Sequence, residues 1–259
     1  DQDHPAIVFD LIEGWSLGEM LVGIGCMLPY SRFVLQCAVQ VVSALCVLHE
    51  NGIVHRDVAL RYATPTLNQN CLLKYCLRNV MITRELVVKL LDFGLAQHGD
   101  DTIRYSRRAN ETIPMRWAPP ETFRVPVGSD AERAAAVDRG VPFSTKTDSW
   151  AVGVLLWEMF TLSLPYGLLP DVEELRHGIC VEGRRLERPP QCPNDLYERV
   201  MRPLFVADPN RRPSMLEIKE QLCALLLELE AGGDLGGFGP RGADTLVDAM
   251  LLEKIYLEL

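Results

Sequence analysis

Apolar residues recur at helical spacing in a long segment near the start of the chain. Within residues 31–50 they fall three or four positions apart, at Phe33, Val34, Cys37, Val41, Leu45 and Leu48. This spacing places them on one face of a helix, and the stop signal Asn51-Gly52 follows directly. We therefore predict an amphipathic helix over residues 31–50 with one buried face.

Apolar runs also predict three helices in the second half of the chain, over residues 150–161, 196–205 and 214–229. The first run is too short to cross a membrane, and it contains the charged residue Glu158. We therefore interpret it as the central helix of a buried core.

The strands predicted by the pattern are short. Residues 80–82 and 87–91 are β-branched and apolar, and a polar turn separates them, which favours a hairpin. Residues 6–9 predict another strand. Gly23-Ile24-Gly25 is interpreted as a turn before the 31–50 helix.

Composition narrows the class of protein. The chain has 259 residues, of which 48% are hydrophobic, and this is enough for one sizeable core. Its net charge of −9 argues against a nucleic-acid partner. The eight cysteines form no C-x-x-C pair, and several fall in apolar helical runs, which indicates reduced thiols in a cytosolic setting.

Two tripeptides carry candidate chemistry. His55-Arg56-Asp57 precedes Asp92-Phe93-Gly94, and Asn79 stands between them. A phosphoryl-transfer site needs an acceptor for the proton of the substrate hydroxyl, and oxygen ligands that hold Mg²⁺ against the phosphates of ATP. Each tripeptide alone is weak evidence of such a site. The order and spacing of further motifs therefore decide whether the chain resembles a known family.

Three further motifs follow in order: Pro119-Pro120-Glu121, Asp148-Ser149-Trp150 and the run 208–213. With these, the chain from about Ile7 to Leu226 resembles the carboxy-terminal lobe of a protein kinase. The resemblance implies an α+β, protein-kinase-like fold whose large lobe is mostly helical with a few short strands.

The resemblance extends to a subclass. The run 57–61, rejoined to Asn79, is similar to the D-L-A-A-R-N loop of receptor-like tyrosine kinases, and residues 113–117 resemble the shelf on which a substrate tyrosine rests. This implies transfer of the ATP γ-phosphate to tyrosine in protein substrates, with ATP and Mg²⁺ as cofactors. The alternative is a pseudokinase or scaffold that binds partners without turnover.

The resemblance also implies roles for single residues. Asp57 is the expected catalytic base, Arg61 a hydrogen-bond donor across the substrate site, and Asn79 and Asp92 the Mg²⁺ ligands. Arg61 is equally explained as a solvated loop residue. Adenine would bind at the hinge formed by residues 10–14, with contacts from Phe9, Asp10 and Ile12; Phe9 is equally explained as a buried strand aromatic.

Other residues are expected to regulate or brace the site. Arg56 would pair with a phosphorylated Tyr105, or Tyr105 stays unmodified in a flexible loop. Asp148 would hold the backbone of the catalytic loop, which His55 orients. His49 and His177 are interpreted as ordinary helix residues.

One structural ion pair is also expected. Arg212 would form a buried pair with Glu121, and loss of either partner would leave the other charge buried and destabilise the lobe.

Two segments interrupt the family pattern. Residues 62–78 fall inside the catalytic loop, and they are either a regulatory insert or sequence retained by a wrong gene model. Residues 125–141 are a second, milder insertion. Sequence amino-terminal to the fifth kinase strand is missing, so the chain is expected to be a fragment that phosphorylates little.

These features suggest two regions. Residues 1–229 are a partial kinase domain, and residues 230–259 are a flexible tail in which Tyr256 is either a site for phosphotyrosine-binding partners or part of a weakly packed end. We expect a cytoplasmic location, as a free enzyme or as the cytoplasmic part of a membrane receptor, with no membrane contact from this segment.

Overall fold

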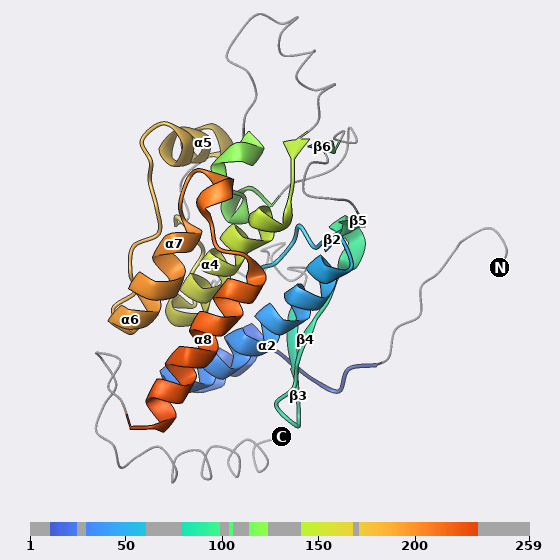
Figure 1. Ribbon diagram of the computed structural model, residues 1–259, viewed down its shortest axis with the longest axis vertical. Helices are drawn as coiled ribbons and strands as arrows, with labels where there is room; N and C mark the ends of the chain where they lie inside the picture. The colour runs from blue at the N-terminus through green and yellow to red at the C-terminus, as the bar shows by residue number, and fades with distance from the viewer. Residues whose placement is uncertain are drawn as a thin grey trace, which may run out of the picture.

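The computed structural model describes residues 11–24, 30–60, 79–98, 104–105, 114–123, 141–167 and 171–232. Figure 1 shows α2, α4 and α8 crossing in the body of the molecule, with the β3–β4 hairpin along one side of α2. The predicted strand at 6–9, the insert at 62–78 and the tail from 233 lie outside the described residues.

The helices are α1 (Leu17–Ile24), α2 (Tyr30–Glu50), α4 (Thr145–Thr161), α5 (Val172–Cys180), α6 (Asn194–Leu196), α7 (Arg202–Leu204) and α8 (Met215–Glu230). A π-helical turn, η5 (Tyr197–Met201), joins α6 to α7. Short 3₁₀ turns are η2 (Phe93–Leu95), η3 (Met115–Trp117), η4 (Pro120–Phe123) and η6 (Pro209–Arg211).

The strands in the described ranges form three small antiparallel sheets. One has the order β1 (Gly14–Ser16), β3 (Val80–Thr83), β4 (Val88–Leu90), with Val80 opposite Leu90. β2 (Ile53–Val54) pairs with β5 (Gln97–His98), and β6 (Arg104–Tyr105) pairs with β7 (Val141–Pro142). The hairpin predicted at 80–82 and 87–91 is therefore confirmed to within a residue or two at each end.

The turn predicted at Gly23-Ile24-Gly25 is wrong for the two residues that the structure describes, because Gly23 and Ile24 belong to α1. Ser16 and Glu19 form a capping box: Glu19 N donates to Ser16 Oγ and Ser16 N donates to Glu19 Oε2, each over 3.2 Å. Leu17 and Leu21 then bury one face of the helix. The cap and this face outweigh the helix-breaking tendency of one exposed glycine.

Two predicted helix boundaries also differ. α4 begins at Thr145 instead of residue 150, because Ser144 and Thr147 cap it with reciprocal hydrogen bonds. The helix predicted over 196–205 is divided by the π-helical turn just before Pro203, which has no N–H to continue the α-helical ladder.

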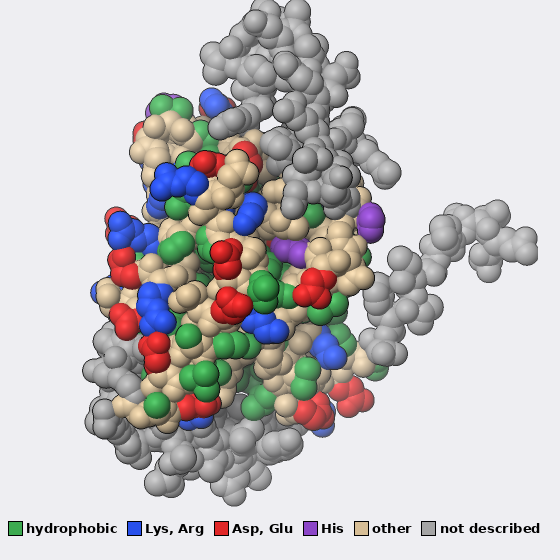
Figure 2. Space-filling model, in the orientation of Figure 1, with side chains coloured by type: hydrophobic (Ala, Val, Ile, Leu, Met, Phe, Trp, Pro, Cys, Tyr) green, Lys and Arg blue, Asp and Glu red, His purple; other side chains and the backbone are tan. Residues whose placement is uncertain are grey.

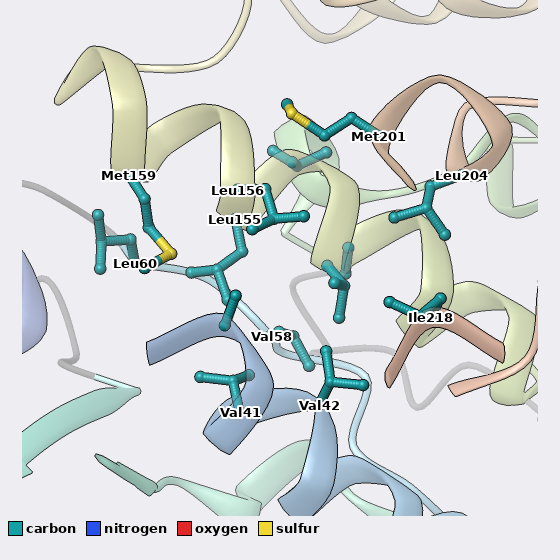
Figure 3. Close-up of a cluster of buried hydrophobic side chains, with 14 of the residues drawn as sticks. Val41, Val42, Val58, Leu60, Leu155, Leu156, Met159, Met201, Leu204 and Ile218 are labelled. Atoms are coloured by element: carbon teal, nitrogen blue, oxygen red, sulfur yellow. The ribbon is translucent and has the colours of Figure 1, made fainter. Parts of the chain in front are cut away.

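α2 and α4 supply much of the core. Figure 3 shows Val41 and Val42 of α2 facing Leu155 of α4, with Val58 and Leu60 of the connecting chain between the two helices. Each of these side chains is buried. The chain that carries the His55-Arg56-Asp57 motif is thus fixed by apolar packing on both sides.

By length and composition, the Ser31–Glu50 stretch of α2 is apolar enough to cross a membrane. Half of that window is buried inside the fold, and α2 packs on α8 and α4. Within the described structure it is therefore a core helix. On the face in Figure 2, acidic and basic side chains are interspersed with apolar ones.

Candidate functional site

The Asp148 carboxylate, in the first turn of α4, holds the start of the catalytic loop. Its two oxygens accept hydrogen bonds from His55 N at 2.8 Å and Arg56 N at 2.9 Å. Asp148 is fully buried, and Arg56 has the uncommon left-handed φ of 68°. The carboxylate therefore stabilises a backbone conformation that the loop would otherwise rarely adopt.

His49 also contacts this carboxylate. Its Nε2 lies 2.9 Å from Asp148 Oδ2, at the last turn of α2. The interpretation of His49 as an ordinary helix residue was therefore wrong. No local sequence signal identified it, because its partner lies 99 positions away.

The His55 side chain links the loop to the segment after β4. Its Nε2 lies 3.2 Å from the carbonyl of Leu91, and Asp57 N donates to its Nδ1 over 3.3 Å. The Leu91 carbonyl can only accept, so Nε2 carries a proton. Nδ1 accepts the Asp57 N–H and therefore carries none, so the imidazole is neutral. Burial lowers the pKa of His55, and the nearby carboxylate of Asp148 opposes this shift.

Asp57 and Asn79 lie in direct contact although 22 positions separate them. Asn79 Nδ2 donates to Asp57 Oδ2 and to the Asp57 carbonyl, each over 2.7 Å. Both residues are buried. The two ends of the interrupted loop therefore meet.

The β3–β4 hairpin brings Asn79 close to Asp92. Asn79 immediately precedes β3 and Asp92 follows β4, so antiparallel pairing puts them at the same end. Leu91 N donates to the Asn79 carbonyl over 2.8 Å. Asp92 has a left-handed φ of 61°, and its Oδ1 accepts from Gly94 N over 3.1 Å.

One buried oxygen at this site fits a cation. Asn79 Oδ1 is buried and accepts no hydrogen bond from any residue that the structure describes. Amide and carboxylate oxygens are ligands that Mg²⁺ uses, and it needs only one or two protein ligands when phosphates supply the rest. No group of three or more His, Cys, Asp or Glu is gathered for a metal among the described residues.

The far end of the catalytic loop is held by a residue that the motifs did not identify as functional. Glu158 Oε2 accepts from Leu60 N over 3.0 Å and from Trp117 Nε1 over 2.7 Å. Glu158 is buried in α4. The available signal was a single carboxylate inside the apolar run 150–161, where an unpartnered charge would be costly.

The segment 113–117 is the one expected to be the substrate shelf, and the structure describes residues 114–117 of it. Arg116 donates to the carbonyls of Pro165, over 2.8 Å, and Gly167, over 2.6 Å. Burial lowers the pKa of the Arg116 guanidinium. The shelf is thus attached through Arg116 to the chain after α4 and through Trp117 to α4 itself.

Glu121 and Arg212 form a bidentate ion pair in the interior. Arg212 Nη1 and Nη2 donate to the two Glu121 oxygens over 2.7 and 2.6 Å. The Arg212 guanidinium also lies over the ring of Trp150, 5.1 Å from its centroid. The structure brings together the two residues paired in the sequence analysis.

Arg56 lies against an aromatic ring. Its guanidinium carbon is 4.2 Å from the centroid of Phe143, which follows β7. Tyr105 pairs with Val141 in the small β6–β7 sheet, so its backbone approaches the same segment. The side chain of Tyr105 lies outside the described residues, and its pairing with Arg56 stays a prediction.

Comparison with protein families matches residues 1–222 of the chain to the protein tyrosine and serine/threonine kinase family. The chain belongs to this kinase family. Fibroblast growth factor receptor 1 of Pleurodeles waltl is 34% identical over 197 residues, which are 76% of this chain and 20% of the receptor. The chain therefore spans about a fifth of the length of this curated relative.

Membership in the kinase family confirms the α+β, protein-kinase-like fold expected from the motifs. Of the predicted kinase site residues, the structure brings Asp57, Asn79 and His55 together and places Asp92 at the adjoining end of the hairpin. Ile12 is half-buried just before β1. Phe9, Asp10, Arg61 and Tyr256 lie outside the described residues.

Proposed function

We propose that the chain is a protein tyrosine kinase domain, which transfers the γ-phosphate of ATP to tyrosine in protein substrates. The observation that carries this proposal is the 2.7 Å contact between Asn79 and Asp57. Positioning supplies most of the catalysis in phosphoryl transfer. An interrupted loop whose two ends still meet therefore retains the arrangement that the chemistry needs.

In this proposal Asp57 accepts the proton of the tyrosine hydroxyl, and Asn79 and Asp92 hold Mg²⁺. The metal would neutralise charge on the transferred phosphoryl group. The carboxylate of Asp57 is oriented by the Asn79 amide, and the Asp57 backbone N–H donates to His55. Both ring nitrogens of His55 are engaged, Nδ1 by the Asp57 N–H and Nε2 by the Leu91 carbonyl, so this side chain acts by orientation and offers no free lone pair to the proton.

Tyrosine as the acceptor is supported by two observations. The shelf 114–117 is linked to the loop through Glu158, and one protein similar to the chain is fibroblast growth factor receptor 1. An apolar shelf suits the longer tyrosine side chain, because it lets the hydroxyl reach the same carboxylate. Substrate contact by Arg61 and adenine contact by Phe9, Asp10 and Ile12 belong to the same proposal.

The remaining expectations are also proposals. Residues 1–229 form the kinase domain, in a cytoplasmic location, and the tail carries Tyr256 as a docking site. Phosphorylated Tyr105 pairs with Arg56 and orders the segment that contains it.

The test is tyrosine-peptide phosphorylation by the full-length protein and its variants. Asp57→Asn should lower the rate about 100- to 10,000-fold, the contribution of a general base. Asn79→Ala should raise the Mg²⁺ concentration needed for half-maximal rate. Asp171→Asn is the matched control, because Asp171 caps α5 far along the chain and asparagine also caps helices. Equal rates for wild type and Asp57→Asn would reject Asp57 as the base.

A scaffold role would give a different result. The wild type would then bind nucleotide or partners without phosphorylating any peptide. Sequencing the transcript across codons 61–79 separates a translated insert from a gene-model error, and a messenger without codons 62–78 would restore the uninterrupted loop.

A further inference from the structure

Glu158 is a buried carboxylate between two functional segments. One of its oxygens, Oε2, accepts both the backbone N–H of Leu60 and the indole N–H of Trp117. Leu60 lies three positions after Asp57, and Trp117 ends the described shelf. A single atom of α4 therefore contacts both the loop that carries the proposed base and the segment proposed to support the substrate.

The two donors differ in how else they are held. The Leu60 side chain is buried in the core beside Met159 of α4, as Figure 3 shows, so this end of the loop is also fixed by packing. Trp117 is only half-buried. Its indole N–H bond to Glu158 at 2.7 Å is short and directional. Trp117 also packs against the edge of the core, and Arg116 anchors the shelf to Pro165 and Gly167, so the bond to Glu158 adds a direct link between the shelf and the loop.

We propose that Glu158 is a positioning residue that couples the Asp57 loop to the substrate shelf and so sets where a tyrosine hydroxyl lies relative to Asp57. The proposal rests on the function proposed above. Loss of the acceptor lets the shelf and the loop move independently. The effect falls on peptide binding and on the rate of phosphorylation of a bound peptide, and it leaves ATP binding unchanged.

The neighbouring residue on α4 offers a matched control. Trp157 donates its indole N–H to the backbone carbonyl of Glu187 over 3.1 Å, a bond from the same donor group to a neutral acceptor in a different part of the lobe. Trp157→Phe and Trp117→Phe therefore remove equivalent atoms from equivalent side chains. Only Trp117→Phe removes a contact to Glu158.

The kinetic experiment compares these two variants of the full-length protein. Trp117→Phe should raise KM for a tyrosine peptide roughly fivefold or more, the equivalent of one net hydrogen bond, while KM for ATP stays constant. Trp157→Phe should change neither constant. Glu158→Gln keeps an acceptor oxygen, so it should raise KM for the peptide less than Glu158→Leu does. Equal effects of the two tryptophan variants, or parallel changes in both KM values, would overturn the proposal.

A second measurement does not depend on activity. Hydrogen exchange at the Leu60 amide should be about fivefold faster in Trp117→Phe than in the wild type, because the Glu158 side chain loses a donor that helps to fix it. Trp157→Phe should leave this rate unchanged. Unchanged exchange in Trp117→Phe would overturn the coupling. A wild type without phosphorylation but with the faster exchange in Trp117→Phe would reject the proposed function and retain the coupling.

Discussion

At the start of α4, one buried carboxylate joins residues from two other parts of the chain. Asp148 receives the side chain of His49 and the backbone N–H groups of His55 and Arg56. Because a buried carboxylate must be satisfied by donors, these contacts are mutually dependent. At the residue scale, the site is a set of buried polar groups that each complete another group's hydrogen bonds.

The Glu121–Arg212 pair gives a prediction for stability. Arg212→Ala should lower the free energy of unfolding by about 3–5 kcal/mol, because it leaves the Glu121 carboxylate buried without its bidentate partner. Urea denaturation measures this change. Arg202→Ala, which removes an exposed ion pair with Glu198, is the control and should have little effect. Similar losses in the two variants would contradict the interpretation.

His55 gives a prediction for pH. Burial lowers its pKa below the ordinary value of 6.5, so below about pH 6.5 the unfolded chain binds a proton that the folded chain does not. Stability from this group is therefore present above that pH and is lost as the pH falls through the folded pKa. His55→Phe should reduce the decline in the free energy of unfolding between about pH 7 and about pH 5. An identical decline in both proteins would rule out this role.

At the scale of elements, α4 supports the catalytic loop at both ends. Asp148 and Glu158 are ten positions apart, which is about 15 Å along a helix. Asp148 holds the loop at His55, and Glu158 holds it at Leu60. The placement of the loop thus depends on the exact start and rigidity of this one helix.

The cap of α4 can be tested directly. Ser144 Oγ accepts from Lys146 N over 3.2 Å, and Ser144 N donates to Thr147 Oγ1 over 3.0 Å. Ser144→Ala should lower the free energy of unfolding by about 1 kcal/mol. Ser144→Asn should retain most of the stability that the cap contributes, because asparagine also caps helices. Thermal or urea unfolding provides the comparison. Ser163→Ala, which removes an exposed hydroxyl after the helix, serves as the control.

At the scale of the whole molecule, α2, α4 and α8 enclose an apolar core, and the site lies where the connecting chain passes over it. The small sheets align polar residues, and the β3–β4 sheet also contributes Val80, Ile82 and Val88 to this core. The β3–β4 hairpin is the clearest case, since it places Asn79 beside the segment that ends in Asp92.

Thiol reactivity reports on this core. Burial raises the pKa of Cys37 and of Cys192 to about 12, whereas Cys180 is exposed. Because the thiolate is the nucleophile, iodoacetamide should modify Cys180 in the folded protein and the other two only after unfolding. Peptide mass spectrometry follows each site. Rapid modification of Cys37 under native conditions would contradict the packing of α2.

Much of the fold was predictable because its signals are local. The helical spacing in α2 and the β-branched runs of the hairpin identified these elements, and the capping pair of Ser16 and Glu19 would have identified α1. The π-helical turn before Pro203 was missed, although the proline was a local warning. The functional motifs could be recognised for a similar reason, because the insert at 62–78 leaves the residue types of the motifs and their order along the chain unchanged.

The sequence by itself therefore determined the family, the main helices and which residues carry the candidate chemistry. Only the tertiary structure decided that Asn79 meets Asp57 across the interruption, that His49 joins Asp148, and that Glu158 bridges the loop and the shelf. The physical reason is that hydrogen bonds between buried groups depend on distance and direction in space. Sequence separations of 22, 99 and 41 positions contain no record of them.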